Sequence, residues 1–178
     1  METCNRKYWF IKCRKKLPGR KGWSWDGYFH RSHPDFAKDH NWGGPSWIRS
    51  AQSRKYIADD VKKNDLVVCY QYEGRRICGL TRMVGDGDVA PKKPKKYCII
   101  HLEATKNALQ LDPPLTIPQL RETSCDPEWT RKGQGTIFPI DPKDFEGILA
   151  AIRQLFPISE EALNAWLKKV GYNRFGSR

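Results

Sequence analysis

Short runs of aromatic and β-branched residues, bounded by Gly, Pro, Asp and Asn, recur along most of the chain. Runs of this kind predict β-strands. We expect strands at 8–12, 66–72, 76–84, 97–104 and 136–138. The turn residues Glu73-Gly74-Arg75 predict a hairpin between the second and third of these strands.

Helical periodicity is strongest towards the end of the chain. Asp141 followed by Pro142 predicts a helix start, because Asp is a good N-cap and Pro suits the first helical position. A last helix is expected over 159–171, capped by the serine at its first position. An earlier helix is expected over 45–60, and a single helical turn at 116–120 in a Pro-rich stretch.

The segment 17–45 shows no regular pattern and is crowded with Gly, Pro, Asp, His and aromatic residues. An irregular segment of this length predicts a functional loop. Short strands with helices between and after them indicate an α+β domain around a small barrel. We expect one domain over 1–178, with a core at about 8–156 and a C-terminal helical extension at about 157–172.

The chain carries a formal net charge of +12, and its pI is about 9.5. A surplus of this size attracts polyanions. The basic run 92–96 is interrupted by Pro94, whereas basic membrane-binding segments are amphipathic helices, so nucleic acid is the favoured partner and a membrane is not. The cations expected to bind a phosphate backbone are Arg14, Lys15, Lys16, Arg20, Lys21, Arg54, Lys92, Lys93, Lys95 and Lys96.

Two further features of the sequence indicate a cytoplasmic protein. No apolar run approaches the roughly 20 residues that span a bilayer. The apolar stretch 8–11, within a basic N-terminal segment, is too short for a signal peptide.

The six cysteines include no C-x-x-C pair, and several lie in apolar strand-like segments, which predicts buried reduced thiols. The alternative is a zinc site, whose ligands would be Cys4, Cys13, His30, His33 and His40. Only His30 and His33 have the spacing of paired zinc ligands. We therefore expect neither a metal nor a cofactor.

Aromatic residues gather in or beside the 17–45 segment, interleaved with Arg and Lys. They are Trp23, Trp25, Tyr28, Phe29, Trp42 and Trp47. Loop tryptophans beside cations suit stacking on bases, which contributes roughly 1–3 kcal/mol per base. The alternative is that the segment folds back into a satellite core. We expect core positions for Trp9 and Trp47, and a ligand site lined by at least one of Trp23, Trp25 and Trp42.

A catalytic interpretation has little support in the sequence. It contains no G-x-x-x-x-G-K-[ST] phosphate loop, no H-E-x-x-H metal helix and no Gly-rich serine elbow. Gly85-Asp86-Gly87-Asp88 is more typical of a turn than of a magnesium site. We therefore expect a non-catalytic protein.

Several segments, taken in order, resemble the EVE domain, a member of the PUA-like superfamily related to YTH and ASCH domains. The segment 8–12 looks like the first strand of that family, and 48–54 is similar to its Val-Arg-Asn-Tyr-Gln-Ala-Arg segment. The segment 61–70 resembles its Gly-Asp-x-Val-x-x-Tyr stretch, 76–80 its Ile-x-Gly strand, and 132–139 its closing strand. The resemblance implies a PUA-like mixed β-barrel with flanking helices, here extended by two C-terminal helices.

The resemblance also implies recognition of a modified base, such as 5-methylcytosine, flipped into an aromatic pocket, and we expect the polymer to be DNA. The expected pocket residues are Trp9, Lys12, Trp23, Trp25, Trp42, Ser46, Trp47, Arg49, Ser50, Gln52 and Tyr70. Ser50 stands where the family has Asn, and Gln71-Tyr72 where it has His-Ser, which affects the identity of the base more than the fold.

Three alternatives stay open. The first is a reader of modified RNA, and the second is a nucleotide-processing enzyme on the same fold, as in some ASCH-like proteins. The third is a protein-interaction module that uses the C-terminal helices and Trp166. A reader would also be expected to act beside a separate effector protein.

Overall fold

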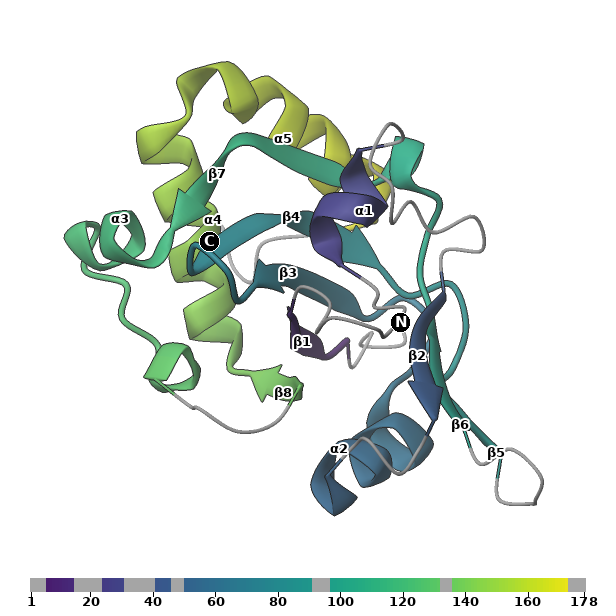
Figure 1. The fold of residues 1–178 in the computed structure, drawn as a ribbon. Coiled ribbons are helices and arrows are strands. Elements are labelled where there is room, and N and C mark those ends of the chain that lie inside the picture. The colour runs from purple at the N-terminus through teal and green to yellow at the C-terminus, as the bar shows by residue number, and fades with distance from the viewer. Residues whose placement is uncertain are drawn as a thin grey trace.

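The computed structural model describes residues 6–14, 24–30, 41–45, 50–90, 97–131 and 136–172. Within these ranges, two β-sheets and the helices around them form an α+β fold (Figure 1). No helix in the same ranges is long and apolar enough to cross a membrane.

The larger sheet has five strands in the order β7-β4-β3-β1-β8. Their bounds are β1 (Tyr8–Cys13), β3 (Leu66–Gln71), β4 (Arg76–Arg82), β7 (Leu109–Thr116) and β8 (Ile137–Ile140). β1 runs parallel to β3, and the other neighbouring strands are antiparallel. β1 therefore lies inside the sheet, with all six of its residues buried.

The smaller sheet has three antiparallel strands in the order β2-β6-β5. They are β2 (Asn41–Pro45), β5 (Asp88–Ala90) and β6 (Tyr97–His101). A bridge between Met83 and Leu102 joins this sheet to the end of β4. The smaller sheet is therefore connected to the larger one through the end of β4.

Helices lie on both sides of the larger sheet and beside the smaller one (Figure 1). They are α1 (Trp25–Phe29), α2 (Ala51–Lys55), α3 (Ile117–Glu122), α4 (Pro142–Leu155) and α5 (Pro157–Lys169). α2 continues as a π-helical turn, Tyr56–Asp60, and 3₁₀ turns occur at Thr105–Asn107 and Glu128–Arg131. α1 packs against β3 and β4, while α4 and α5 pack together on the other side of the sheet.

Alternation along the strands divides the interior into two hydrophobic clusters, because successive side chains of a strand point to opposite faces. Tyr8 and Phe10 of β1 pack in the cluster covered by α4 and α5. Trp9, Ile11 and Cys13 pack in the other, with α1, β2 and the smaller sheet. This division decides which of the expected pocket residues can meet.

The structure confirms the expected strands and the helix that begins at Pro142 under an Asp141 cap, but other elements differ from those expected. The 17–45 segment contains α1 and β2, and β5 lies within the expected loop at 85–96. Pro45 ends β2 instead of beginning a helix. The last helix begins at Pro157, two residues before the expected cap.

The Pro-rich stretch after residue 110 proves to be a strand. β7 includes Pro113 and Pro114, which have no N–H to donate to a neighbouring strand. Proline is tolerated in β7 because, among the described strands, β7 lies at the edge of the sheet and pairs only with β4, and because both prolines lie between the paired residues Gln110 and Leu115, where the register shifts.

Candidate nucleic-acid interface

The tryptophans expected in the pocket lie in the interior of the protein. Trp9, Trp25 and Trp42 share one hydrophobic cluster, and none is more than 2% exposed. The indole N–H of Trp25 donates to the carbonyl oxygen of Ile11 at 2.8 Å, and that of Trp42 lies 3.0 Å from the Cys13 sulfur. Burial therefore leaves these rings no open face for stacking on a base.

Trp9 is fixed by a buried carboxylate. Its indole N–H donates to Asp65 Oδ2 at 2.8 Å, and the backbone amides of Lys7 and Lys62 donate to the same carboxylate, each at 3.0 Å. Burial raises the pKa of Asp65, and these three hydrogen bonds oppose the rise. The Trp9 ring packs edge-on against Tyr56, which follows α2. This arrangement attaches the helix to the sheet.

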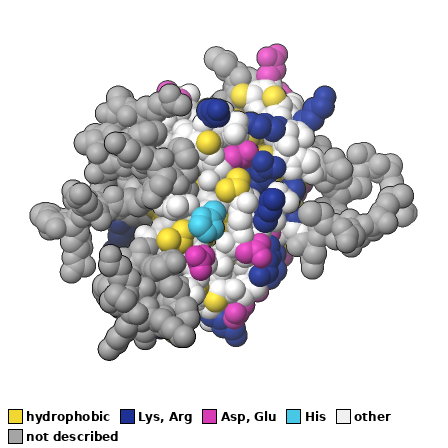
Figure 2. Space-filling view, turned by 90° about the vertical axis from the view of Figure 1, so that its right-hand side faces the viewer, with side chains coloured by type: hydrophobic (Ala, Val, Ile, Leu, Met, Phe, Trp, Pro, Cys, Tyr) yellow, Lys and Arg dark blue, Asp and Glu magenta, His cyan; other side chains and the backbone are white. Residues whose placement is uncertain are grey.

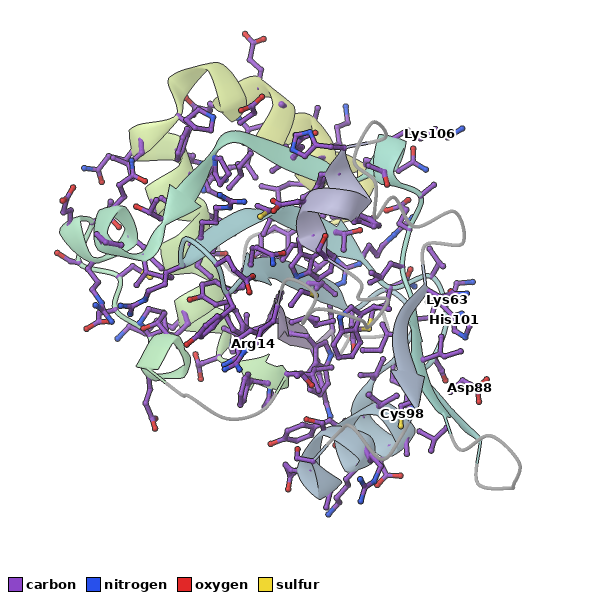
Figure 3. The ribbon with its side chains drawn as sticks, viewed as in Figure 1. Arg14, Lys63, Asp88, Cys98, His101 and Lys106 are labelled. Carbon is purple, nitrogen blue, oxygen red and sulfur yellow. The ribbon has the colours of Figure 1, made fainter. Side chains whose placement is uncertain are left out.

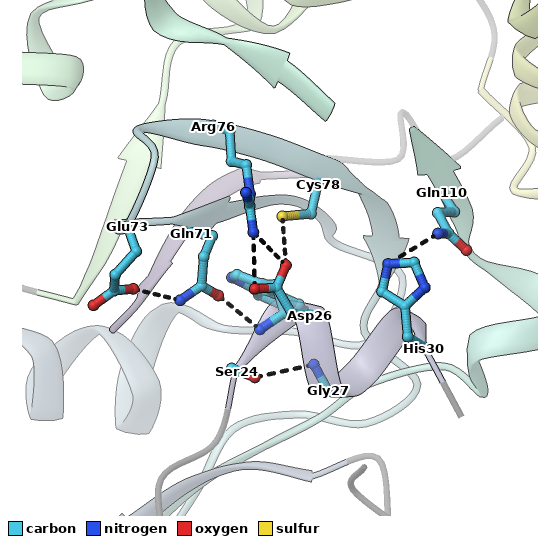
Figure 4. Close-up of polar contacts among 10 residues, drawn as sticks. Ser24, Asp26, Gly27, His30, Gln71, Glu73, Arg76, Cys78 and Gln110 are labelled. Carbon is cyan, nitrogen blue, oxygen red and sulfur yellow. Dashed lines mark hydrogen bonds and ion pairs between the residues drawn. The ribbon is translucent and has the colours of Figure 1, made fainter. Parts of the chain in front are cut away.

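A polar network holds α1 on the sheet (Figure 4). Both carboxylate oxygens of Asp26 accept from Arg76 of β4 at 2.8 Å. The side-chain oxygen of Gln71, at the end of β3, accepts from the backbone amide of Trp25 at 3.0 Å, and its amide nitrogen donates to Glu73 at 2.7 Å. The sequence offered no signal for these contacts beyond the departure from the family pattern at Gln71.

Lys12 and Tyr70, also expected in the pocket, lie on the face of the sheet opposite the tryptophans. They are neighbours in the parallel pairing of β1 with β3, and Tyr70 packs against Phe10 with ring centroids 4.8 Å apart. The structure therefore separates the expected pocket residues into two groups, because Trp9 and Lys12 differ by an odd number of positions along one strand.

Around Lys12, cations and aromatic rings form a group that we term the basic–aromatic cluster: Lys12, Arg14, Tyr70, Tyr72 and Arg75. The Arg14 guanidinium lies 4.2 Å from the Tyr72 ring centroid, and the Lys12 ammonium lies 5.4 Å from it. Both distances fall in the range of cation–π attraction. The cluster lies where β1 and β3 end, and Arg14 is visible beside β1 and β8 in Figure 3.

Tyr72 is the exposed aromatic member of the cluster, whereas Tyr70 is buried. Tyr72 is 43% exposed, and among the described residues only Val84 is a comparably exposed large hydrophobic side chain. The sequence carried a signal for this position, because Tyr72 lies two residues after Tyr70 and so shares its face just beyond the strand. Our sequence-based site did not include it.

Burial and charge shift the titration of two members of the cluster. Burial lowers the pKa of Lys12, and the charge of Arg14 lowers it further. Burial raises the pKa of Tyr70, while a hydrogen bond from Arg75 and the charge of Arg75 oppose that rise. Three cations thus lie close to two phenolic rings, an arrangement that attracts an anion carrying a flat ring.

Of the residues expected to contact a ligand from the start of α2, Ser50 already forms hydrogen bonds within the protein. The Ser50 hydroxyl caps the helix by accepting from the Ser53 amide at 3.1 Å, and it donates to the Ser53 hydroxyl at 3.0 Å. Gln52 is exposed and Arg54 is half-buried. Among these residues, Gln52 is the one best placed to contact a ligand without disturbing the helix cap.

The remaining expected residues fall outside the described ranges, and their roles stay predictions. They are Trp23, Ser46, Trp47 and Arg49 of the pocket, and Lys15, Lys16, Arg20, Lys21, Lys92, Lys93, Lys95 and Lys96 of the backbone set.

The face that includes the smaller sheet has a different electrostatic character. Figure 2 shows Lys and Arg side chains interspersed there with Asp and Glu. Arg82 donates to Glu103 at 2.8 Å, and Lys62 lies 3.7 Å from Asp86. Neighbouring carboxylates therefore offset these two cations on the described part of this face.

The described cysteines are buried and reduced, as the sequence predicted. Burial raises the pKa of Cys69, and it raises the pKa of Cys78 to about 12 and that of Cys125 to about 11. No group of three metal-ligand side chains occurs among the described residues, which leave out Cys4, His33 and His40.

No protein-family model and no curated protein matches the chain. Its fold is similar to that of Rpa0253 from Rhodopseudomonas palustris, with a TM-score of 0.58 and 16% identity over 84% of this chain and 94% of that one. The DUF55 domain of human thymocyte nuclear protein 1 matches with a TM-score of 0.56 and 12% identity, over 80% of this chain and 96% of that one.

The human THYN1 protein, solved in complex with 5-methylcytosine-containing DNA, matches with a TM-score of 0.51 and 14% identity, over 81% of this chain and 96% of that one. At identities this low, the structural similarity establishes a shared fold and nothing more. The PUA-like fold expected from the sequence resemblance is therefore confirmed, while membership of the EVE family stays a prediction. The chain adopts an α+β, PUA-like fold.

Proposed function

We propose that the chain is a non-catalytic nucleic-acid-binding domain that recognises a modified, 5-methylcytosine-like base in DNA. The observation that carries nucleic-acid binding is the exposed ring of Tyr72, with Arg14 and Lys12 within cation–π distance, in a chain of net charge +12. An aromatic face beside cations accommodates a base and its phosphate together.

The fold supports the modified-base part of the proposal, because human THYN1 protein shares it and was solved with 5-methylcytosine-containing DNA. A flipped base needs aromatic walls and a few fixed polar groups. The core already contains three of the tryptophans, Trp9, Trp25 and Trp42. We therefore propose Trp23 and Trp47 as the walls of the pocket.

Fluorescence anisotropy tests the proposal. Oligonucleotides of one sequence would carry cytosine, 5-methylcytosine, 5-hydroxymethylcytosine or N6-methyladenine, each as DNA and as RNA, at low and moderate salt. We expect the tightest binding to a modified cytosine in DNA, and Trp23→Ala or Trp47→Ala should remove the preference. A methyl group contributes only about 1 kcal/mol by burial, so the preference should be roughly fivefold to tenfold.

A charge-matched pair of variants distinguishes binding at this interface from general electrostatic attraction of the nucleic acid to the protein. Arg14→Ala and Lys63→Ala each remove one exposed cation, and Figure 3 shows the two residues on different parts of the molecule. Arg14→Ala should weaken binding to every sequence and reduce the salt dependence by about one counterion, whereas Lys63→Ala should do neither. Equal effects of the two variants would show that binding follows net charge and not this site.

Two other outcomes favour different functions. Preference for a modified base in RNA alone would replace DNA with RNA as the polymer. No binding to any oligonucleotide would refute the proposal, and incubation with modified nucleosides would then test for an enzyme.

A further inference from the structure

We infer that Tyr72 and its neighbours form a second nucleotide site, which holds an unpaired and unmodified nucleotide of the strand beside the recognised base. This inference rests on the proposed function, because it assumes a nucleic-acid ligand. It assigns to the basic–aromatic cluster a role separate from the reading of the modification.

The exposure of Tyr72 indicates that this site does not distinguish one base modification from another. A site that distinguishes one modified base needs an enclosed cavity with fixed polar groups around the base edge. Tyr72 is 43% exposed, and among the described residues its ring lies against the cations Lys12 and Arg14. A ring of this kind stacks on any base, because every base has a π-face. It therefore selects for unpaired nucleotides without regard to their modification.

Lys12, which lies 5.4 Å from this ring, has a hydroxyl-bearing neighbour on each adjacent strand. The Lys12 amide donates to the carbonyl of Thr136 at 2.8 Å, and the next pair along the two strands is Ile11 with Ile137. Lys12 and Thr136 are therefore opposite each other in an antiparallel pair and share one face of the sheet. Tyr70 flanks Lys12 on the other side, in the register with β3.

The hydroxyl of Thr136 is a further group that a phosphate could engage. It is buried and has no hydrogen-bond partner in the structure as described. Buried hydroxyls are normally paired, and an unpaired one indicates a missing ligand or strain. A phosphate oxygen would accept from Thr136 Oγ1 and from the Lys12 ammonium together, while the attached base lies on Tyr72.

The test uses unmodified fluorescein-labelled oligothymidylate and oligouridylate of about 12 nucleotides, with a duplex of equal length as comparison. Tyr72→Ala should weaken single-strand binding by about fivefold to 100-fold, the loss expected for one stacked base. Tyr72→Phe keeps the ring and should bind within about twofold of the wild type. Val84→Ala is the matched control, because Val84 is equally exposed but lies at the end of β4.

Thr136→Val tests the phosphate contact, because it replaces the hydroxyl with a methyl group of similar size. It should weaken binding to oligothymidylate and oligouridylate by a similar factor, roughly twofold to tenfold. It should not lower the urea midpoint, because the hydroxyl that it removes has no partner in the described structure. Unchanged binding by this variant would overturn the phosphate assignment.

The two proposals fail in different ways. If Tyr72→Ala binds single strands as the wild type does, or if Val84→Ala weakens binding equally, the second site is wrong, whatever the preference for 5-methylcytosine. If the wild type shows no preference for a modified base while Tyr72→Ala still weakens single-strand binding, the modified-base proposal fails and the second site stands. Tyr72→Phe binding as weakly as Tyr72→Ala would exclude stacking as its basis.

Discussion

Replacing Trp25 with Phe should destabilise the protein without changing its affinity for nucleic acid. Trp25 is completely buried, and its indole N–H donates to the Ile11 carbonyl at 2.8 Å. Phe keeps an aromatic ring at the position but removes that donor and part of the ring. The substitution therefore distinguishes a core residue from the base-stacking residue that the sequence suggested.

The expected cost follows from these two losses. A buried hydrogen bond contributes about 1 kcal/mol net. The lost ring atoms contribute on the order of 1 kcal/mol more, through reduced burial and the space left behind. Trp25→Phe should therefore lower the free energy of unfolding by about 2 kcal/mol, measured from urea unfolding followed by circular dichroism.

Trp166 offers a matched control for the same substitution. It is 5% exposed, and its indole N–H has no partner among the described residues. Trp166→Phe also removes ring atoms, but it removes an unpaired buried donor as well, so its net cost should be near zero. If Trp25→Phe costs no more than Trp166→Phe, the hydrogen bond from Trp25 to Ile11 does not stabilise the fold. If Trp25→Phe loses nucleic-acid binding while its stability is unchanged, Trp25 belongs to the ligand site and not to the core.

Gly79→Ala should lower the free energy of unfolding by about 2 kcal/mol or more, because the added Cβ would lie 2.2 Å from the backbone oxygen of Leu109; an unchanged melting temperature would contradict this. The Cys78 thiol should make the fold less stable in alkali. Burial, and then the charge of Asp26, raises its folded pKa to about 12 from an ordinary 9.0, so the stability it contributes is present below pH 9 and is lost as the pH rises towards 12. Between pH 9 and 10.5 the urea midpoint of the wild type should therefore fall more steeply than that of Cys78→Ala, and parallel slopes would contradict the assignment.

The strands and the Asp141-capped helix could be predicted because their signals are local. β1 and β3 are continuous runs of apolar residues, and Asp141-Pro142 is a start signal in itself. α1 has only five residues, one of them Gly27, so it is too short to show helical periodicity. β7 was missed because its prolines weigh against a strand, and its edge position, which makes them tolerable, is a tertiary property.

The site was only partly predictable. Alternation along β1 was enough to place Trp9 and Lys12 on opposite faces of the sheet. The family resemblance nevertheless led us to expect both residues in one pocket. The burial of Trp25 and Trp42 could not be read from the sequence, because it depends on Ile11 and Cys13, residues distant in the chain. Loop tryptophans beside cations have the same composition whether they face a ligand or the core.

Direct competition tests in one experiment whether the chain prefers a modified base. A labelled duplex with a single 5-methylcytosine would be bound first, and unlabelled duplexes of the same sequence, with or without the methyl group, would then be titrated at fixed salt. We expect the methylated competitor to displace the label at a roughly fivefold to tenfold lower concentration. Superimposed displacement curves would contradict it.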